Sequence, residues 1–114
     1  MKLLLIAALL LATMPAQALT GNEYMQYTDS AKVTLVTGLA YGFQASSTFN
    51  NMKEAWCLPA DGVPFGQIRK ILDKYLINNP EVLHHDIGIS YFVAIETAFP
   101  CQPSRKTSGK GTRF

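Results

Sequence analysis

Two cysteines, Cys57 and Cys101, enclose the part of the chain with the clearest apolar pattern and limit how it can fold. In an oxidising compartment, a single pair of cysteines is typical of one disulfide bond. The chain-entropy estimate for a bridge that closes a loop of this length is about 4 kcal/mol. For a chain of 114 residues, that is a large fraction of the total stability. Two unpaired thiols are the alternative. Whether the protein resides in an oxidising or a reducing compartment decides between the disulfide and the thiols.

Residues 1–18 have the features of a cleaved secretory signal. Lys2 supplies a positive charge, residues 3–12 form an uninterrupted apolar run, and alanines occupy the signal-peptidase positions within residues 16–18. The run is too short to span a membrane, and no later stretch is long and apolar enough, so we expect no membrane contact after cleavage. The pattern predicts cleavage after Ala18 and a periplasmic product that begins at Leu19. A buried N-terminal helix of a cytosolic protein is the alternative.

Length predicts a single domain, which we expect to be helical and to span residues 19–103. Residues 104–114 lack periodicity and are rich in Ser, Gly, Lys and Arg, which predicts a disordered basic tail. The whole chain has a formal net charge of +2. The excess of positive charge comes from four residues of the tail, namely Arg105, Lys106, Lys110 and Arg113. The domain itself is mildly acidic, so we expect no nucleic-acid partner.

The N-terminal half of the domain has the spacing of one long amphipathic helix. Asn22 can cap this helix, and Glu23 favours its positive end. Residues of the expected buried face recur at intervals of three and four: Tyr24, Met25, Thr28, Ala31, Leu35, Val36, Leu39, Ala40 and Phe43. Gly38 and Gly42 predict close packing against another helix, and a surface left bare for a partner is the alternative. Residues 44–51 are polar and predict a loop or the frayed end of this helix.

Two further helices are predicted between the cysteines. Pro64 can occupy the first turn of a helix with an apolar stripe formed by Phe65, Ile68, Leu72, Tyr75 and Leu76. Residues 78–80 stop this helix, and Pro80 opens a short turn. Asp86 can cap the last helix, which Pro100 ends. The predicted fold class is therefore all-α, a small helical bundle of about four helices stapled by one disulfide.

No catalytic motif is present, because the chain lacks a P-loop, a G-x-S-x-G elbow, an H-E-x-x-H pair and a C-x-x-C pair. We expect a protein that is not an enzyme and that uses no cofactor and no metal. His84 and His85, with Glu81 or Asp86, could form a weak metal site or a pH-sensing patch. The more ordinary interpretation is one histidine at a helix edge and one in solvent. A zinc site that combines both histidines with both cysteines lacks the usual ligand-pair spacing.

The stretch from Trp56 to Cys101 resembles the second half of the Rap/Tai family of type VI secretion immunity proteins. The resemblance rests on a Cys-x-Pro, a Gly-Val, a Gly-Gln that opens a helix, a Tyr-Leu, a Pro-Glu and a closing Phe-Pro-Cys. These motifs correspond to Cys57 and Pro59, Gly62 and Val63, Gly66 and Gln67, Tyr75 and Leu76, Pro80 and Glu81, and Phe99, Pro100 and Cys101. The first half matches less closely. Many members have another cysteine pair there, and this chain has Tyr27 and Val36 near the expected positions.

The resemblance implies a disulfide-stapled, all-helical periplasmic protein that binds a secreted toxin, often a peptidoglycan amidase, and inhibits it sterically with a surface loop. It also suggests a homodimer. The matched motifs do not contain the blocking loop. We predict a partner-binding segment at residues 79–86 with Glu81, His84, His85 and Asp86, because it is polar and lies between two apolar helices. A periplasmic acid-stress chaperone, or a structural helical module with no dedicated toxin, is the alternative.

Overall fold

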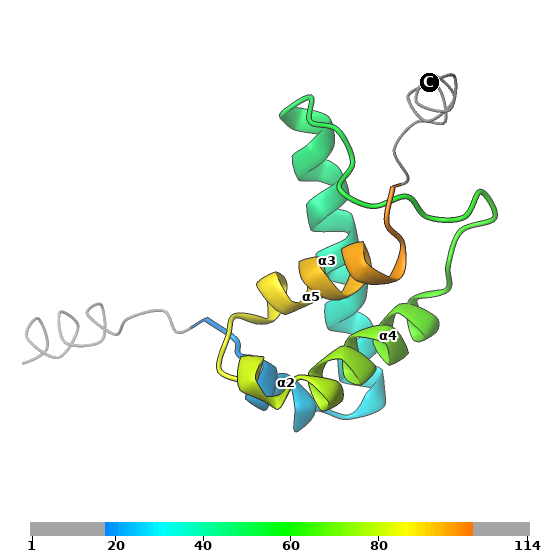
Figure 1. The fold of residues 1–114 in the computed structure, drawn as a ribbon. Coiled ribbons are helices and arrows are strands. Elements are labelled where there is room, and N and C mark those ends of the chain that lie inside the picture. The colour runs from blue at the N-terminus through cyan, green and yellow to red at the C-terminus, as the bar shows by residue number, and fades with distance from the viewer. Residues whose placement is uncertain (1–17, 102–114) are drawn as a thin grey trace, which may run out of the picture.

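The computed structural model describes residues 18–101, so the predicted tail and nearly all of the predicted signal peptide lie outside the described residues. The α-helices are α2 (Gly21–Met25), α3 (Asp29–Phe49), α4 (Phe65–Asn78) and α5 (Ile87–Ala98), and the 3-10 helix η1 (Pro80–Val82) lies between α4 and α5. Both α4 and α5 pack on α3, and α2 lies near the C-terminal end of α4 (Figure 1). The predicted all-α bundle with one disulfide is confirmed.

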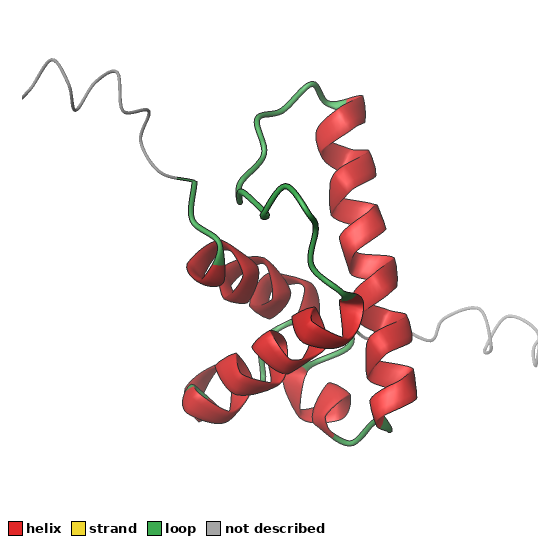
Figure 2. Cartoon of the chain, turned by 90° about the vertical axis from the view of Figure 1, so that its right-hand side faces the viewer, coloured by secondary structure: helices red, strands yellow, loops and turns green. Residues whose placement is uncertain are grey.

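None of the described helices is long and apolar enough to cross a membrane. The longest, α3, has 21 residues and reaches beyond the rest of the bundle (Figure 2). It includes residues 44–49, for which the sequence predicts either a loop or the frayed end of the helix, and the second alternative is confirmed. Polar side chains in this stretch donate to carbonyls four residues earlier, Thr48 Oγ1 to Gln44 O at 3.0 Å and Asn50 Nδ2 to Ser46 O at 2.8 Å. Their hydrogen bonds are thus compatible with the helix, which explains why polarity alone is misleading here.

The prediction of a single N-terminal helix that begins at Asn22 is wrong, because the chain forms α2 and α3 with a break at residues 26–28. Thr20 caps α2: its Oγ1 accepts from Glu23 N at 3.4 Å, and the Glu23 carboxylate accepts from Thr20 N at 3.2 Å. Thr28 caps α3 by accepting from Ala31 N at 3.2 Å. Although Thr28 fits the helical spacing, a threonine hydroxyl stabilises a helix more as an N-cap than inside it.

One hydrophobic core joins the four α-helices. Its buried residues are Tyr24 of α2, Val36 of α3, Ile68, Leu72 and Leu76 of α4, and Ile87, Tyr91, Ala94 and Ile95 of α5. The predicted stripe of α4 is confirmed, with Phe65 and Tyr75 half-buried against this core. The approach of α2 to α4 favours a glycine, since a Cβ at Gly21 would lie 3.1 Å from Leu76 Cδ2 and 3.1 Å from Leu83 O, which is tighter than most Cβ contacts.

A cluster of charged side chains connects α2, α3 and α4. The Asp73 carboxylate lies 2.7 Å from Arg69 Nη1 and 3.5 Å from Lys32 Nζ, and Arg69 Nη1 lies 3.4 Å from Asp29 Oδ1. Lys32 Nζ is also 5.2 Å from the centroid of the Tyr24 ring. Burial and then the nearby Asp73 carboxylate raise the pKa of the Tyr24 hydroxyl well above its usual range. Since these charges are matched by partners within the fold, we assign the cluster to structure and not to binding.

Gly38 and Gly42 do not serve close helix packing inside the chain, contrary to the sequence prediction. Both are exposed, and a Cβ built at either position would meet no atom within 4 Å. The buried side of α3 is marked instead by Lys32 and Val36. Both glycines therefore belong to the outer face of α3.

Candidate partner-binding surface

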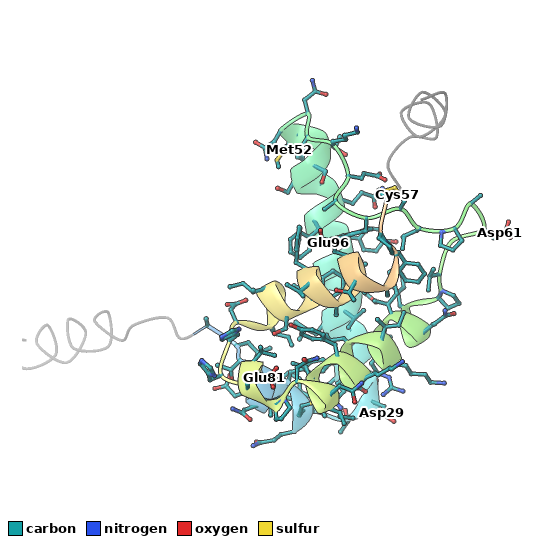
Figure 3. All side chains as sticks on the ribbon, in the orientation of Figure 1. Asp29, Met52, Cys57, Asp61, Glu81 and Glu96 are labelled. Atoms are coloured by element: carbon teal, nitrogen blue, oxygen red, sulfur yellow. A yellow bond between two sulfur atoms is a disulfide. The ribbon has the colours of Figure 1, made fainter. Side chains whose placement is uncertain are left out.

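The predicted partner-binding segment forms a compact turn between α4 and α5, here called the 79–86 turn. Asn79 ends α4 and fixes the turn by donating from Nδ2 to Tyr75 O at 2.8 Å. Pro80 then opens η1, as the sequence predicts. Glu81, His84 and His85 are exposed (Figure 3 labels Glu81). The turn thus presents three polar side chains that can form hydrogen bonds with a partner.

Backbone hydrogen bonds fasten the 79–86 turn to the start of α2. Gly21 N donates to His85 O at 3.1 Å, Asn22 N donates to Leu83 O at 2.9 Å, and Ile87 N donates to Leu19 O at 2.8 Å. An isolated β-bridge pairs Thr20 with Asp86. Because these contacts hold both sides of the turn, its exposed side chains stand on a backbone that is already ordered before any partner binds.

Asp86, unlike the other three predicted residues, has a structural role. It is half-buried, and its Oδ1 accepts from Gly88 N at 2.7 Å, which confirms the predicted cap of α5. An N-cap carboxylate also interacts favourably with the helix dipole. A change at Asp86 would therefore alter the fold as well as any contact with a partner.

The rings of His84 and His85 lie close together, with centroids 4.5 Å apart and planes at 73°. Within residues 18–101, no group of three or more His, Cys, Asp or Glu side chains is arranged to hold a metal ion. The two rings are open to solvent. In this geometry they are suited to hydrogen bonding or stacking with an incoming surface.

A second solvent-facing segment, here called the 50–64 connection, links α3 to α4. The disulfide between Cys57 and Cys101 is confirmed, with a Cα–Cα distance of 4.9 Å. Beside it, Cys57 N donates to Phe99 O at 2.9 Å, and a β-bridge pairs Trp56 with Pro100. The sequence reasoning did not consider this connection as a binding surface, although its prolines, glycine and polar residues are typical of an exposed loop.

The tip of the 50–64 connection is a tight turn, at the residue labelled Asp61 in Figure 3. Gly62 N donates to Pro59 O at 2.9 Å, and Gly62 has a φ of 78°. This left-handed conformation favours glycine strongly. The matched motif residues Pro59 and Gly62 are therefore explained by the backbone of the turn.

The other motif residues also occupy positions that shape the chain. Gly66 and Gln67 lie in the first turn of α4, Tyr75 and Leu76 near its end, and Pro80 at the start of η1. Phe99 follows α5, and Pro100 pairs with Trp56 beside the disulfide. The motif thus marks helix ends and fastening points, and among these residues Leu76 is fully buried.

An aromatic groove of about 1010 Å³ lies between the C-terminal half of α3, the 50–64 connection and the facing sides of α4 and α5. Phe43 stacks on Tyr91 with centroids 5.6 Å apart and planes at 8°, while Trp56 meets Phe92 edge-on at 5.4 Å. Burial raises the pKa of the Tyr91 hydroxyl to about 12. The groove joins the disulfide side of the molecule to the core, and no single sequence motif identifies it.

The model of the Rap1a immunity protein family matches residues 10–101, which is most of the chain. The chain therefore belongs to the Rap1a immunity proteins, and the match covers the N-terminal half as well as the segment from Trp56 to Cys101. No curated protein matches the chain. No solved structure matches it either.

Proposed function

We propose that this immunity-type protein acts in the periplasm, where it binds a secreted peptidoglycan-hydrolysing toxin, such as an amidase effector, and blocks it sterically. Membership of the Rap1a immunity proteins carries this proposal, because such proteins work by binding a cognate toxin. Steric inhibition requires a surface that keeps its shape while it fills a cleft. The bundle offers two fastened, solvent-facing segments for this purpose.

We assign toxin contact to the 79–86 turn. Its three exposed polar residues, Glu81, His84 and His85, stand on backbone that is hydrogen-bonded to residues 19–22. A turn that is already ordered loses little conformational entropy on binding, which favours affinity. The toxin's cleft would then meet a carboxylate and two imidazole rings, so we expect the complex to depend on hydrogen bonds and charge.

Two described residues at the predicted cleavage site support export. Leu19 is half-buried, packs against the core and accepts from Ile87 N at 2.8 Å, whereas Ala18 is exposed. Cleavage after Ala18 would therefore keep Leu19, its contact with the core and its hydrogen bond from Ile87 N. The disulfide agrees with an oxidising compartment.

The experiment uses the oxidised mature protein from Leu19 as bait in secreted and periplasmic extracts. A captured hydrolase is then purified, and its cleavage of isolated peptidoglycan is measured with increasing amounts of the bait protein. Stoichiometric inhibition is the expected result. Absence of any hydrolase partner contradicts the proposal, and broad client binding only in acid would support a chaperone instead.

A matched pair of variants then tests the assigned surface. The triple variant Glu81→Ala, His84→Ala, His85→Ala should weaken toxin binding by about tenfold or more while thermal unfolding stays unchanged. The control, Lys53→Ala, Glu54→Ala, Asp61→Ala, removes three exposed charges from the 50–64 connection and should bind normally. The reverse result would move the toxin contact to the 50–64 connection.

We also propose a homodimer, as the family resemblance suggests. A dimer would present two 79–86 turns and could bind two toxin molecules.

A further inference from the structure

The α5 helix is largely apolar on its exposed side as well as on its buried side. Glu96 is the only charged residue within the helix. The buried residues of α5 are Ile87, Ser90, Tyr91, Ala94 and Ile95. Its exposed residues are Ile89, Val93, Glu96, Thr97 and Ala98. A helix that is hydrophobic all round is normally buried on every side, so we expect another surface to cover the outer side of α5.

The neighbouring helix α4 shows a more usual outer side within the same fold. Its exposed residues are Gln67, Lys70, Lys74, Ile77 and Asn78, most of which are polar or charged. On α5, by contrast, Ile89 is 59% exposed and Val93 is 37% exposed. No other described helix covers the outer side of α5 in Figure 1 or in Figure 2. The apolar side chains of α5 are therefore open to a partner.

The exposed residues of α5 form one face that continues from the 79–86 turn. Ile89, Val93 and Glu96, here called the α5 face, follow one another at intervals of four and three residues, which places them on the same side of the helix. His85 of the turn is exposed and lies four residues before Ile89. The Asp86 side chain caps α5 and so fixes the junction between the turn and the helix. A partner that contacts the turn can therefore contact the α5 face as well.

The chain segment that contains the α5 face is acidic. Between Tyr75 and Cys101 it has three acidic residues, Glu81, Asp86 and Glu96, and no lysine or arginine. Interfaces are commonly complementary in charge, with a positive patch against a negative one. A surface that combines aliphatic side chains with carboxylates therefore fits a partner surface that is apolar at its centre and has lysine or arginine at its edge.

Charge also disfavours a second copy of this chain as the partner at this face. A two-fold interface places each part of a surface near an equivalent part of itself. The Glu96 carboxylates of two copies would then lie on the same small contact, and like charges at an interface repel each other. A different protein with basic residues avoids this repulsion.

We propose that the toxin contact extends beyond the 79–86 turn along the α5 face, and that the bound toxin surface is apolar at its centre and basic at its edge. This inference rests on the proposed function, because it adds a second part to the same contact. The turn contributes hydrogen bonds, Ile89 and Val93 contribute apolar surface, and Glu96 pairs with a basic side chain. Burial of apolar surface is the dominant favourable term in most protein–protein association. The α5 face thus supplies a contribution that the polar turn lacks.

The test compares two matched double variants for their affinity for the purified hydrolase that the wild-type bait captures. Ile89→Gln with Val93→Gln removes the apolar part of the α5 face and should not lower the melting temperature, because glutamine favours a helix more than isoleucine or valine does. The control, Met52→Gln with Leu58→Gln, makes the same kind of change in the 50–64 connection, at residues that are 63% and 41% exposed. In calorimetric titrations the α5 variant should bind at least about tenfold more weakly, and the control should bind like the wild type.

A charge reversal tests the expected chemistry of the toxin surface. Glu96→Lys should weaken binding at low ionic strength, and the loss should shrink at about 0.5 M salt, because salt screens exposed charges. Glu54→Lys changes an exposed acidic residue of the 50–64 connection and should leave the affinity unchanged. Equal or tighter binding by Glu96→Lys at low ionic strength would contradict a basic edge on the toxin.

The triple-alanine variant of the 79–86 turn, measured in the same series, separates this inference from the proposed function. Loss of affinity in the turn variant with none in the α5 variant overturns the inference and leaves the proposed function standing. An α5 variant with unchanged affinity but a lower molar mass in sedimentation equilibrium would assign the α5 face to a second copy, which also overturns the inference. If the wild-type bait captures no hydrolase, the inference and the proposed function fail together.

Discussion

The 50–64 connection and the 79–86 turn are both exposed, and each is fastened to a segment far away in sequence, but by different chemistry. The first is held covalently, by Cys57 and Cys101, with one backbone hydrogen bond beside the disulfide. The second has no covalent link and is held by backbone hydrogen bonds to residues 19–22, by the Asn79 side chain and by the Asp86 cap. The longer connection has the covalent staple, while the shorter turn is ordered by hydrogen bonds.

Comparing the two segments shows what a disulfide and what backbone hydrogen bonds each need in order to hold an exposed segment. A disulfide reduces the entropy of the unfolded chain and needs little support from neighbouring packing. Backbone hydrogen bonds require close approach, which here depends on glycine at position 21. We therefore expect different substitutions to destabilise the two segments. The predictions below run from the largest expected effect to the smallest.

Removing the staple should have the largest effect. Replacing Cys57 and Cys101 by serine should lower the free energy of unfolding by about 4 kcal/mol, because the unfolded chain regains the entropy of an open loop. Urea unfolding of the variant and of the oxidised and reduced wild-type protein measures this. The reduced wild type should match the variant. A loss below about 1 kcal/mol would show that the 50–64 connection is held by packing around Trp56 instead.

Adding a side chain at Gly21 should have the next largest effect and should act on the 79–86 turn. Gly21→Val places atoms against Leu76 and Leu83, both already 3.1 Å from a Cβ, and should destabilise the fold by about 1–3 kcal/mol. Amide exchange should show faster opening at residues 83–87. Gly66→Ala, with open space around its Cβ, serves as the control and should be neutral or stabilising. Equal stability of the two variants would contradict the close approach of α2.

Removing the cap of α5 should have a smaller effect on the same turn. Asp86→Ala loses the hydrogen bond from Gly88 N and should reduce stability by about 1 kcal/mol. Asp86→Asn keeps an acceptor and should lose less. Asp61→Ala changes an exposed aspartate in the other connection and should stay within about 0.5 kcal/mol of the wild type. The claim fails if Asp86→Ala and Asp61→Ala have the same melting temperature.

Raising the pH should have the smallest effect on stability, with no change near neutrality. The effect should involve two buried tyrosines, Tyr24 of α2 and Tyr91 of α5. Burial raises the pKa of Tyr91 to about 12, and Tyr24 is also raised. A folded-state pKa above the unfolded value, about 10 for tyrosine, gives stability that is complete below pH 10 and is lost as pH rises towards the folded pKa. Melting temperatures should therefore fall between about pH 10 and pH 12.

The contribution of Tyr91 can be isolated by substitution. Tyr91→Phe should reduce the alkaline fall in melting temperature, because its hydroxyl no longer ionises on unfolding. Tyr41→Phe changes a ring that is 60% exposed and should leave the fall unchanged. An identical alkaline profile in Tyr91→Phe and the wild type would contradict the role assigned to its burial.

The stapled side of the molecule could be predicted from sequence better than the hydrogen-bonded side. The chain has only two cysteines, and cysteines form disulfides only with each other. The sequence therefore predicts directly that Cys57 and Cys101 lie in contact. The hydrogen bonds between residues 19–22 and 83–87 use backbone groups that nearly every residue has. They therefore cannot be predicted from the side chains of these residues. Gly21 is the one signal of the close approach, and it could equally have been a turn residue.

The apolar stripe of α4 and the Asp86 cap could also be predicted, because each depends on local spacing. The break at residues 26–28 could not, since Thr28 satisfies both a buried-face pattern and an N-cap. For residues 44–49, polarity could not decide between a loop and the end of the helix, because it does not show that the polar side chains bond to their own helix. Gly38 and Gly42 show a further limit: spacing places them on one face of α3 but does not tell whether that face turns inward or outward.

The central claim is that this chain inhibits a peptidoglycan hydrolase by occupying its cleft. The most direct test is a titration of the captured hydrolase with oxidised mature protein, read as cleavage of isolated peptidoglycan. The account predicts a linear fall in activity to zero at one chain per toxin, and an inhibition constant that is at least about tenfold higher for the Glu81, His84 and His85 triple-alanine variant. Full hydrolase activity in the presence of saturating wild-type protein would contradict it.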